Sequence, residues 1–392
     1  MKLINITKLC NVEIGKTPSR NEMTYWGTGV NWVSIRDMKE KYIFDTNEKI
    51  TSKAISETGI KLVPKNTVIM SFKLSVGKVA IVGKDMYTNE AIAAFHILDE
   101  SKLYNKYLYY ALQTLRLSDN TDRAVMGLTL NKKKLKQISI PVPPLEAQKK
   151  IVEALDKAQG LIDARKEQIR LIDELIQSVF YEMFGDPIIN PMRWKVDKLD
   201  KHVISIDSGW SPKCLNNKAP NNEWGVLKLS AVTGGMYNEE QNKELPKGVE
   251  PRVNLEIKKG DLLLTRKNTP ELVGDCCYVF ETRGKLMMPD IIFRINTLSE
   301  IDKTFLWALF NNHTFKQRIK MMASGSAKSM VNISKAKLNN LDIIVPDYEV
   351  QLKFSSKLNH IRKKNNLLKE SLYKLENCLK SIMQKAFSGE LH

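Results

Sequence analysis

Apolar residues recur at alternating steps of four and three in two long stretches of the chain, between residues 151 and 183 and between residues 354 and 386. This spacing places the side chains on one stripe of an α-helix, and a stripe kept over roughly five heptads is typical of a coiled-coil seam. We therefore expect two long helices, over about 145–184 and 348–387. The predicted seam residues are Ile151, Leu155, Ile162, Ile169, Ile172, Ile176 and Val179 in the first helix, and Phe354, Leu358, Ile361, Leu368, Leu372, Leu375, Leu379 and Ile382 in the second.

Two positions depart from the apolar stripe. Arg165 interrupts the first copy, and Asn365 occupies a seam position in the second. A buried asparagine would fix the register of the pairing at some cost in stability, whereas an asparagine turned to solvent would mark a locally open seam. The sequence leaves both interpretations open.

The start of each long stretch belongs to an internal repeat with an offset of 203 residues. The matched positions are Leu130 and Ile333, Leu135 and Leu338, Pro143 and Pro346, Glu146 and Glu349, and Gln148 and Gln351. In both copies an apolar run ends at proline, which suits a strand followed by the first turn of a helix. The glutamate falls in that first turn, where the helix dipole favours a carboxylate. The repeat predicts two similar halves related by a pseudo-two-fold axis, with the two helices antiparallel.

The segments before the helices predict two α+β domains. Short β-like runs at 32–35, 67–71, 79–82, 93–98 and 138–142 are separated by turn residues, and a helical stretch covers 106–117. The second half repeats this order at an offset of 194, which grows to 203 toward the helix. The second domain has therefore gained about nine residues in surface loops, where contact residues also tend to lie.

The positive charge of the chain is concentrated in the two domains. The formal net charge is +17, of which residues 1–143 carry +9 and residues 187–346 carry +7, whereas residues 144–186 carry −3 and residues 347–392 carry +4. Such a distribution is typical of a protein that binds a polyanion, and we expect nucleic acid.

The five cysteines form no metal or disulfide pattern and indicate reduced thiols. No apolar run is long enough for a membrane helix, so we expect a cytoplasmic protein and no membrane partner.

The motifs of DNA-modifying enzymes are missing from the sequence. The only Pro-Pro pair, Pro143–Pro144, lacks the Asp or Asn and the aromatic residue that hold an adenine amine in a methyltransferase. The stretch from Gly77 to Lys84 has one residue too many for a phosphate-binding loop, and Pro289–Asp290 lacks the following acidic-x-Lys of a nuclease. The histidines show no metal-ligand spacing. We therefore expect no catalytic residue and no metal site in this chain.

Polar residues on paired loops remain as candidates for nucleic-acid contacts. The turn at 15–20 matches the turn at 209–213, and the segment at 71–75 matches the segment at 265–269, each of the latter after a predicted strand. Hydroxyls and cations in such turns can contact phosphates, and Arg or Asn can read bases in the major groove. The candidate DNA-binding residues are Lys16, Thr17, Ser19, Arg20, Arg36, Lys73, Ser75, Asn89, Trp210, Ser211, Lys213, Lys228, Arg266, Lys267, Asn268 and Arg283.

These features together resemble the specificity subunit of type I restriction–modification systems, over essentially the whole chain. The resemblance is carried by residues 140–148 with the heptads that follow, and by their second copy at 343–351. Shorter matches are Gly15–Pro18, Val30–Trp32, Asn89–Ala91 and Gly260–Leu263; the second copy departs from the pattern at Asp347 and at Met288–Asp290. The resemblance implies a target recognition domain at 1–143, a central spacer helix at 144–186, a second target recognition domain at 187–346 and a C-terminal spacer helix at 347–392.

By this resemblance the chain is a non-catalytic subunit of a bacterial or archaeal cell. It would recognise a bipartite sequence in double-stranded DNA and dock two methyltransferase subunits, and through them the restriction and motor subunits. S-adenosylmethionine, ATP and Mg²⁺ would be bound by those partners, and no cofactor by this chain. Two alternatives belong to other classes. One is a stand-alone methyltransferase or nuclease with degenerate motifs, and the other is a basic coiled-coil scaffold that binds RNA or an acidic protein.

Overall fold

The computed structural model describes residues 3–73, 75–115, 122–124, 127–129, 132–325 and 330–388. The chain divides into two compact units. Unit 1 comprises Met1–Lys166 and Glu370–His392, and unit 2 comprises Glu167–Lys369. Two long helices, α4 (Leu145–Phe184) and α8 (Tyr348–Ser388), each contribute one part to each unit. The helices predicted from the heptads are thus present, while the four domain boundaries stay a prediction because both helices are shared.

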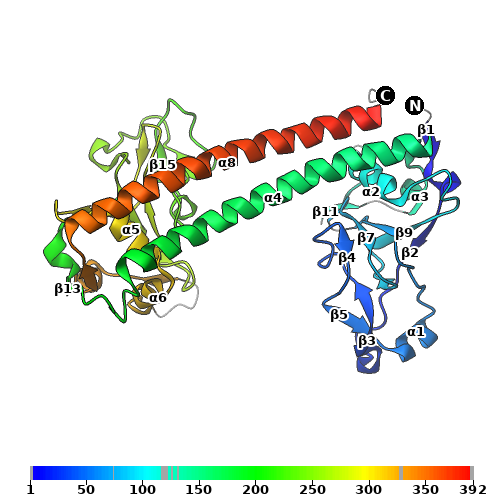
Figure 1. Cartoon of the computed structure of the whole chain (residues 1–392), viewed down its shortest axis with the longest axis horizontal. Coiled ribbons are helices and arrows are strands. Elements are labelled where there is room, and N and C mark those ends of the chain that lie inside the picture. The colour runs from blue at the N-terminus through cyan, green and yellow to red at the C-terminus, as the bar shows by residue number, and fades with distance from the viewer. Residues whose placement is uncertain are drawn as a thin grey trace. The chain divides into compact units, whose positions relative to one another are not determined.

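A five-stranded sheet and a smaller three-stranded sheet build the domain of unit 1. The larger sheet has the order β2-β9-β6-β7-β4 and is antiparallel except for the β4–β7 pair. Its strands are β2 (Cys10–Ile14), β9 (Ile92–Ile97), β6 (Val68–Ser71), β7 (Val79–Val82) and β4 (Tyr42–Ile43). The smaller sheet consists of β5 (Glu48–Ile50), β3 (Trp26–Val33) and β8 (Tyr87–Thr88). It lies with α1 (Ser52–Thr58) at the end of unit 1 farthest from α4 and α8 (Figure 1).

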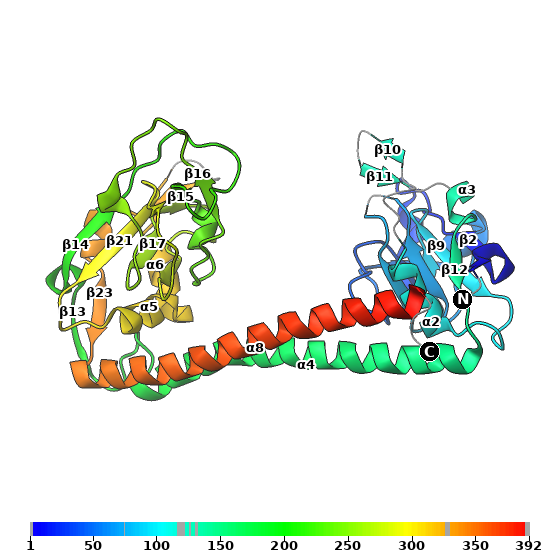
Figure 2. The same cartoon turned by 90° about the horizontal axis from the view of Figure 1, so that it is seen from above.

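The domain of unit 2 has the same architecture. Its larger sheet has the order β14-β21-β17-β19, and its smaller sheet the order β16-β15-β20. The strands are β14 (Val203–Ser208), β21 (Ile292–Thr297), β17 (Leu262–Thr265), β19 (Cys276–Tyr278), β16 (Asn242–Glu244), β15 (Gly225–Leu227) and β20 (Leu286–Met287). The helices are α5 (Lys303–Asn311), α6 (His313–Met321) and α7 (Lys335–Asn339), and α5 lies beside the part of α4 and α8 in this unit (Figure 2).

Apart from β4, the strands of both sheets in unit 1 have counterparts in unit 2, as the repeat in the sequence predicted. The order β2-β9-β6-β7 corresponds to β14-β21-β17-β19, and β5-β3-β8 corresponds to β16-β15-β20. In each small sheet one strand pair is antiparallel and the other is parallel. A short antiparallel pair closes each domain just before its long helix. This pair is β1 (Leu3–Asn5) with β12 (Ser139–Pro141) in unit 1, and β13 (Lys195–Lys198) with β23 (Asp342–Val345) in unit 2.

The remaining helices and strands of unit 1 are short and belong to the first domain. The helix predicted over 106–117 is α2, but it spans Asn105–Gln113 and thus ends earlier than expected. The reason is Thr114, whose backbone N–H and side-chain hydroxyl both donate to the carbonyl of Ala111, at 3.3 and 2.8 Å, so that the helix is capped there. The other elements are β10 (Asp122–Ala124), β11 (Gly127–Thr129) and α3 (Lys132–Leu135).

Both long helices contribute to the hydrophobic core of each domain. In unit 1, Leu155 of α4 is fully buried in a cluster that also contains Ala386 near the end of α8. In unit 2, Phe184 at the end of α4 packs against Phe354 near the start of α8, with ring centroids 5.4 Å apart. Within each unit the start of one helix therefore packs beside the end of the other, as expected for an antiparallel pair.

Burial along the predicted seam is uneven. Ile151, Leu155, Ile162, Ile176, Phe354 and Leu358 are buried, whereas Ile169, Ile172, Val179, Ile361, Leu368, Leu372, Leu375, Leu379 and Ile382 are half-buried. Of the buried positions, all except Ile162 belong to the hydrophobic core of a domain. Asn365 is 5% exposed, and its Oδ1 has no hydrogen-bond partner among the described residues. Of the two interpretations of this asparagine, the structure thus favours the buried one.

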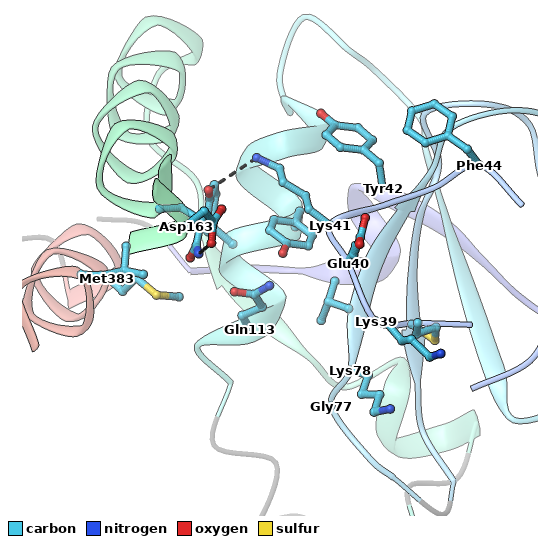
Figure 3. A pocket seen from close by; sticks show the side chains of 16 residues that line it. Lys39, Glu40, Lys41, Tyr42, Phe44, Gly77, Lys78, Gln113, Asp163 and Met383 are labelled. Carbon is cyan, nitrogen blue, oxygen red and sulfur yellow. Dashed lines mark hydrogen bonds between the residues drawn. The ribbon is translucent and has the colours of Figure 1, made fainter. Parts of the chain in front are cut away.

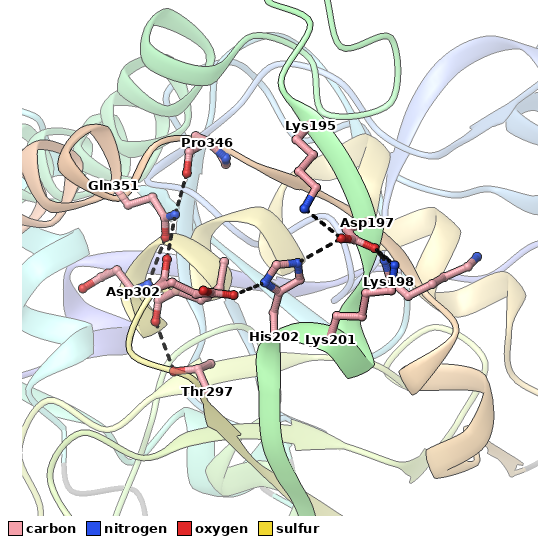
Figure 4. Close-up of polar contacts among 11 residues, drawn as sticks. Lys195, Asp197, Lys198, Lys201, His202, Thr297, Asp302, Pro346 and Gln351 are labelled. Carbon is pink, nitrogen blue, oxygen red and sulfur yellow. Dashed lines mark hydrogen bonds and ion pairs between the residues drawn. The ribbon is translucent and has the colours of Figure 1, made fainter.

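In each unit, one buried glutamine at the start of a long helix joins that helix to the domain. We call this contact the domain–helix joint. Gln148 of α4 accepts a hydrogen bond from the backbone N–H of Tyr104 at 2.9 Å and donates to the carbonyls of Lys102 and Pro143, both at 2.8 Å. In unit 2, Gln351 accepts from the N–H of Asp302 at 2.9 Å and donates to the carbonyls of Glu300 and Pro346, at 3.3 and 2.8 Å (Figure 4). Tyr104 and Asp302 precede the helices α2 and α5, so one side chain fixes a strand end and a helix start in each domain.

A network of charged and polar side chains lies next to Gln351 in unit 2. The buried His202 forms a hydrogen bond through Nδ1 with Glu300, at 2.7 Å, and its Nε2 lies 3.7 Å from Asp197 (Figure 4). Hydrogen bonds from Lys201 and Lys195 hold the pKa of Asp197 well below its usual value. The network connects β13 to the loop before α5 and leaves the histidine between two carboxylates.

Candidate nucleic-acid interface

The turn at residues 15–20 lies directly against the turn that joins β8 to β9. A Cβ atom on Gly15 would lie 2.2 Å from the carbonyl oxygen of Thr88, so only glycine fits at this position. Lys16 donates its backbone N–H to the same carbonyl at 2.8 Å, and the hydroxyl of Thr17 donates to the carboxylate of Glu90. These contacts hold the backbone of the turn while the side chains of Lys16, Ser19 and Arg20 remain exposed.

The equivalent turn of unit 2 is held by equivalent contacts. A Cβ atom on Gly209 would lie 1.8 Å from the carbonyl oxygen of Met288, and Trp210 donates its N–H to that carbonyl at 2.9 Å. The hydroxyl of Ser211 donates to the carboxylate of Asp290. Although Met288–Asp290 departs from the Asn-Glu pattern of the first copy, Asp290 accepts the hydrogen bond that Glu90 accepts in unit 1. The two turns are therefore structurally equivalent.

An arginine beside the first turn is stacked and ion-paired. The guanidinium of Arg20 lies 3.8 Å from the ring centroid of Trp26 and 5.1 Å from that of Trp32. Both of its terminal nitrogens donate to the carboxylate of Glu48, and this hydrogen bonding raises the pKa of Arg20 and lowers that of Glu48. The pair is about half exposed, so the ion pair contributes little to stability and can exchange for a phosphate or a base at low cost.

The predicted contact residues after β17 are partly used within the protein. Arg266 donates from Nε to Asn332 at 3.2 Å, and its guanidinium lies 4.9 Å from the ring centroid of Phe293. Lys267 and Asn268 form the short strand β18, which pairs with β22 (Val331–Asn332). Asn268 is buried, and its Oδ1 accepts the N–H of Thr269 at 2.9 Å. A base contact by Arg266 would thus use its terminal nitrogens.

The other predicted contact residues fall into two groups: some side chains form hydrogen bonds within the protein, and others are exposed to solvent. Arg283 is half-buried and donates from one nitrogen to the carbonyls of Asn221, Glu223 and Gly284, at 3.0 to 3.2 Å, so this nitrogen fixes loop backbone. Asn89 accepts the N–H of Ala91 and stabilises a turn. The residues with exposed side chains are Arg36, Lys73, Ser75, Ser211 and Lys213. The ammonium of Lys73 lies 5.5 Å from the ring of Phe72.

A hollow of about 330 Å³ lies beside the second turn. It is lined by Ser211, Pro212, Cys214, Val226, Leu227, Lys228, Leu229, Lys243, Pro289 and Ile291. The structure thus brings the predicted residues Ser211 and Lys228 together at one concave surface, with apolar walls between them. Lys243 also lines this surface but was not predicted from the sequence, because it lies on β16, which no motif marks. Two cations around an apolar floor fit a nucleic-acid backbone and the face or methyl group of a base.

A larger hollow of about 870 Å³ lies in unit 1 beside α4 and α8 (Figure 3). Lys41 contacts the wall formed by α4 and α2: it donates to the carboxylate of Asp156 and, at 3.4 Å, to the hydroxyl of Tyr110. Burial opposes ionisation of Asp156, but the hydrogen bonds from Lys41 and Tyr110 outweigh it and keep the pKa below its usual value. The hollow is therefore lined by the ion-paired ammonium of Lys41 and by aromatic rings, together with the exposed Lys39 and Lys78.

Metal ligands and reactive thiols are two further kinds of functional group that the described side chains of both units could provide. No group of three or more His, Cys, Asp or Glu among the described residues could hold a metal ion. Burial raises the pKa of Cys10 to about 12 and that of Cys276 well above its usual value, which keeps these thiols protonated. Among the described helices, none combines the length and the apolar character that crossing a membrane requires. The paired turns, with their cations and aromatic rings, are suited to contact phosphates and bases.

Comparison with known proteins agrees with this description. Residues 1–173 match the family model of the type I restriction modification DNA specificity domain. The chain is 34% identical over 208 residues to the EcoEI specificity subunit of Escherichia coli, an alignment that covers 53% of this chain and 33% of that relative. It is 25% identical over 412 residues to the MjaIX specificity subunit of Methanocaldococcus jannaschii, which covers 96% of this chain and 90% of the relative. The first part of the chain thus matches the specificity-domain model, and most of the chain is similar in sequence to type I restriction–modification specificity subunits.

Solved structures show the same fold. The type I restriction–modification S subunit from M. genitalium aligns with a TM-score of 0.55 at 14% identity, over 98% of this chain and 96% of that chain. A chain from a study of complex assembly and conformational transition of the type I restriction–modification system aligns with a TM-score of 0.62 at 17% identity, over 100% and 98% of the two chains. The fold described above is thus shared with these solved structures.

Proposed function

We propose that this chain is the DNA-reading subunit of a type I restriction–modification complex. Residues 1–143 read one half of a split sequence in duplex DNA, and residues 187–346 read the other half. The observation that carries the proposal is the pair of equivalent turns. Gly15 and Gly209 lie against the carbonyls of Thr88 and Met288, and a hydroxyl–carboxylate hydrogen bond follows in both turns. Two domains that hold the same turn in the same way, but with different exposed side chains, suit two half-sites of different sequence.

The charge distribution supports duplex DNA as the ligand. The two domains carry net charges of +9 and +7, while residues 144–186 carry −3. Lys and Arg that neutralise phosphates release counterions, and this release supplies much of the affinity of DNA-binding proteins. The exposed Lys213 lies on the second turn itself, so positive charge is available where bases would be read.

We further propose that the chain docks two methyltransferase subunits, and through them restriction and motor subunits. S-adenosylmethionine, ATP and Mg²⁺ are then bound by these partners. The repeat supports this stoichiometry, because two similar domain–helix joints offer two similar surfaces. Gln148 and Gln351 build these joints with the same set of backbone contacts. The exposed apolar residues Leu161, Leu171 and Leu175 of α4 suit contact with a partner.

The test combines a genomic measurement with a domain exchange. Sequencing that detects modified adenines is applied to cells with the gene, without it, and complemented by the wild-type gene. A bipartite methylated motif that disappears with the gene and returns with complementation is the expected result. Exchange of residues 187–346 for the corresponding domain of a relative should then change one half of the motif only.

Assays on the purified chain separate the alternatives. The purified chain alone, incubated with labelled S-adenosylmethionine and duplex DNA, should transfer no methyl group. Methyl transfer by the chain alone would make it an enzyme in its own right. Equal affinity for duplex DNA, RNA and an acidic polypeptide would support the scaffold alternative. A change in both halves of the motif after the exchange would contradict independent reading by the two domains.

A further inference from the structure

The same two positions of the repeat contact each other within each unit, but the cation comes from the first position in unit 1 and from the second position in unit 2. At an offset of 194, Lys16 corresponds to Trp210 and Thr58 corresponds to Arg252. In unit 1 the ammonium of Lys16 donates to the carbonyl of Thr58 at 2.6 Å. In unit 2 the guanidinium of Arg252 lies 4.3 Å from the ring centroid of Trp210. Each domain therefore places one cation at the same spot, a lysine from the turn in one and an arginine from the facing loop in the other.

The backbone on both sides of the second contact is fixed. Trp210 belongs to the turn held by Met288, and its ring packs against two hydrophobic clusters of the domain. Arg252 donates its backbone N–H to the sulfur of Met287 at 3.2 Å, and its carbonyl accepts the N–H of Leu255 at 2.9 Å. The indole holds the guanidinium plane, and the anchored loop holds the start of the side chain, so the arginine is ordered before any ligand binds.

The donors of Arg252 remain free, in contrast to the neighbouring arginines. In the same domain, guanidinium hydrogen bonds or ion pairs to other protein groups are made by Arg266, Arg283, Arg294 and Arg318. In unit 1, Arg20 is also stacked on indole rings, but Glu48 occupies its donors. For Arg252, which is exposed, no side-chain hydrogen bond or ion pair is found within the described residues. A stacked arginine with an open donor edge is suited to a planar acceptor with two adjacent atoms.

We propose that Arg252 reads a guanine in the half-site bound by residues 187–346, with Trp210 as the residue that positions it. This inference rests on the proposed function and names one specificity-determining contact within it. The O6 and N7 atoms of guanine accept two hydrogen bonds from a guanidinium in the major groove, and no other base offers this pair of acceptors. The lysine at the equivalent spot of unit 1 is tied to a backbone carbonyl, so the two half-sites are read differently at this position.

The experiment selects bound duplexes from a random pool with the full chain, assembled with its methyltransferase subunits, and sequences the enriched molecules. Arg252→Ala removes the guanidinium, and Arg252→Gln replaces it with a side chain that pairs with adenine. Lys247→Ala is the matched control, because it removes an exposed cation from the same loop without touching Trp210. For the wild type and the control we expect one guanine in the second half-site that both Arg252 variants lose, with the rest of the motif unchanged.

Binding to two fixed duplexes gives the magnitude. Arg252→Ala should lower the preference for the cognate duplex, over one substituted at that guanine, by about 5- to 150-fold. A second half-site that keeps its guanine in both variants overturns the inference, as does an equal loss of affinity for every duplex, since that marks a phosphate contact. If the wild type enriches no bipartite motif, the proposed function itself fails, and this outcome is distinct from a motif that Arg252 does not affect.

Discussion

Gln148→Ala is the substitution whose effect the structure defines most closely. The side chain is fully buried and makes three hydrogen bonds to main-chain atoms of the first domain, at 2.8 to 2.9 Å. Removing it leaves the N–H of Tyr104 and the carbonyls of Lys102 and Pro143 without this partner. At about 0.5–1.5 kcal/mol for each hydrogen bond, the local opening of this joint should become easier by roughly 1.5–4.5 kcal/mol.

Hydrogen exchange followed by mass spectrometry measures this opening directly. Since about 1.4 kcal/mol corresponds to a tenfold change, amides in residues 102–112 should exchange between about tenfold and a thousandfold faster in the variant. Residues 300–310, which surround the equivalent Gln351, should keep their exchange rates because they belong to the other unit. Gln351→Ala should give the reverse pattern.

Gln159→Ala is the matched control on the same helix. Its side chain donates to Asp163 four residues further on, at 2.8 Å, and such a surface pair contributes only about 0.2–0.5 kcal/mol. The reasoning is refuted if Gln148→Ala accelerates exchange in residues 102–112 no more than this control does. In that case water or a neighbouring side chain would replace the lost hydrogen bonds, and the joint would not depend on glutamine.

Three further predictions concern the core, the ligand and the helices. Phe184→Ala should destabilise unit 2 by about 3–5 kcal/mol, because the fully buried ring contacts Phe305 and Phe354; an unchanged urea midpoint would contradict this. Binding of duplex DNA should weaken steeply with salt on a log–log plot, and a flat dependence would show that the positive charge of the domains does not contact phosphates. Inserting four residues after Ala164, and four at the matching position after Leu367, adds about 6 Å to each helix. The methylated half-sites should then lie one or two base pairs further apart, at about 3.4 Å per base pair, whereas an active variant with the original spacing would show that the helices do not set it.

The elements that follow from short-range patterns were predicted well from the sequence. Steps of four and three gave α4 and α8 to within a residue or so, and the run at 79–82 is β7. The offsets of the repeat anticipated matching strand orders, because equivalent apolar positions must face equivalent cores. The end of α2 was wrong, since Thr114 caps the helix through its side chain, an effect that apolar periodicity does not record.

The chemistry of the interface depends on contacts between distant segments and was predicted less well. Gln148 and Gln351 were recognised as matched, but their roles require backbone atoms more than 40 residues away in the sequence. Arg252 was missed because its partner Trp210 lies on another loop. Arg283 was predicted to contact DNA, and the structure directs one of its nitrogens to carbonyls of its own domain, which only the folded loop brings together. Which of the candidate residues contact DNA stays a prediction.

The contacts of Gln148 and Gln351 also affect which changes of the gene leave a folded protein. Both glutamines contact main-chain atoms only, and a carbonyl or an N–H is available whatever residue occupies the position. A domain with an unrelated loop sequence can therefore be attached to the same helix without compensating substitutions, as long as its backbone follows the same path. Recombination between two alleles at the ends of a domain, next to these glutamines, would produce a folded hybrid in one step. The lineage could thus acquire a new specificity by exchanging a segment of its gene, rather than by accumulating point mutations through inactive intermediates.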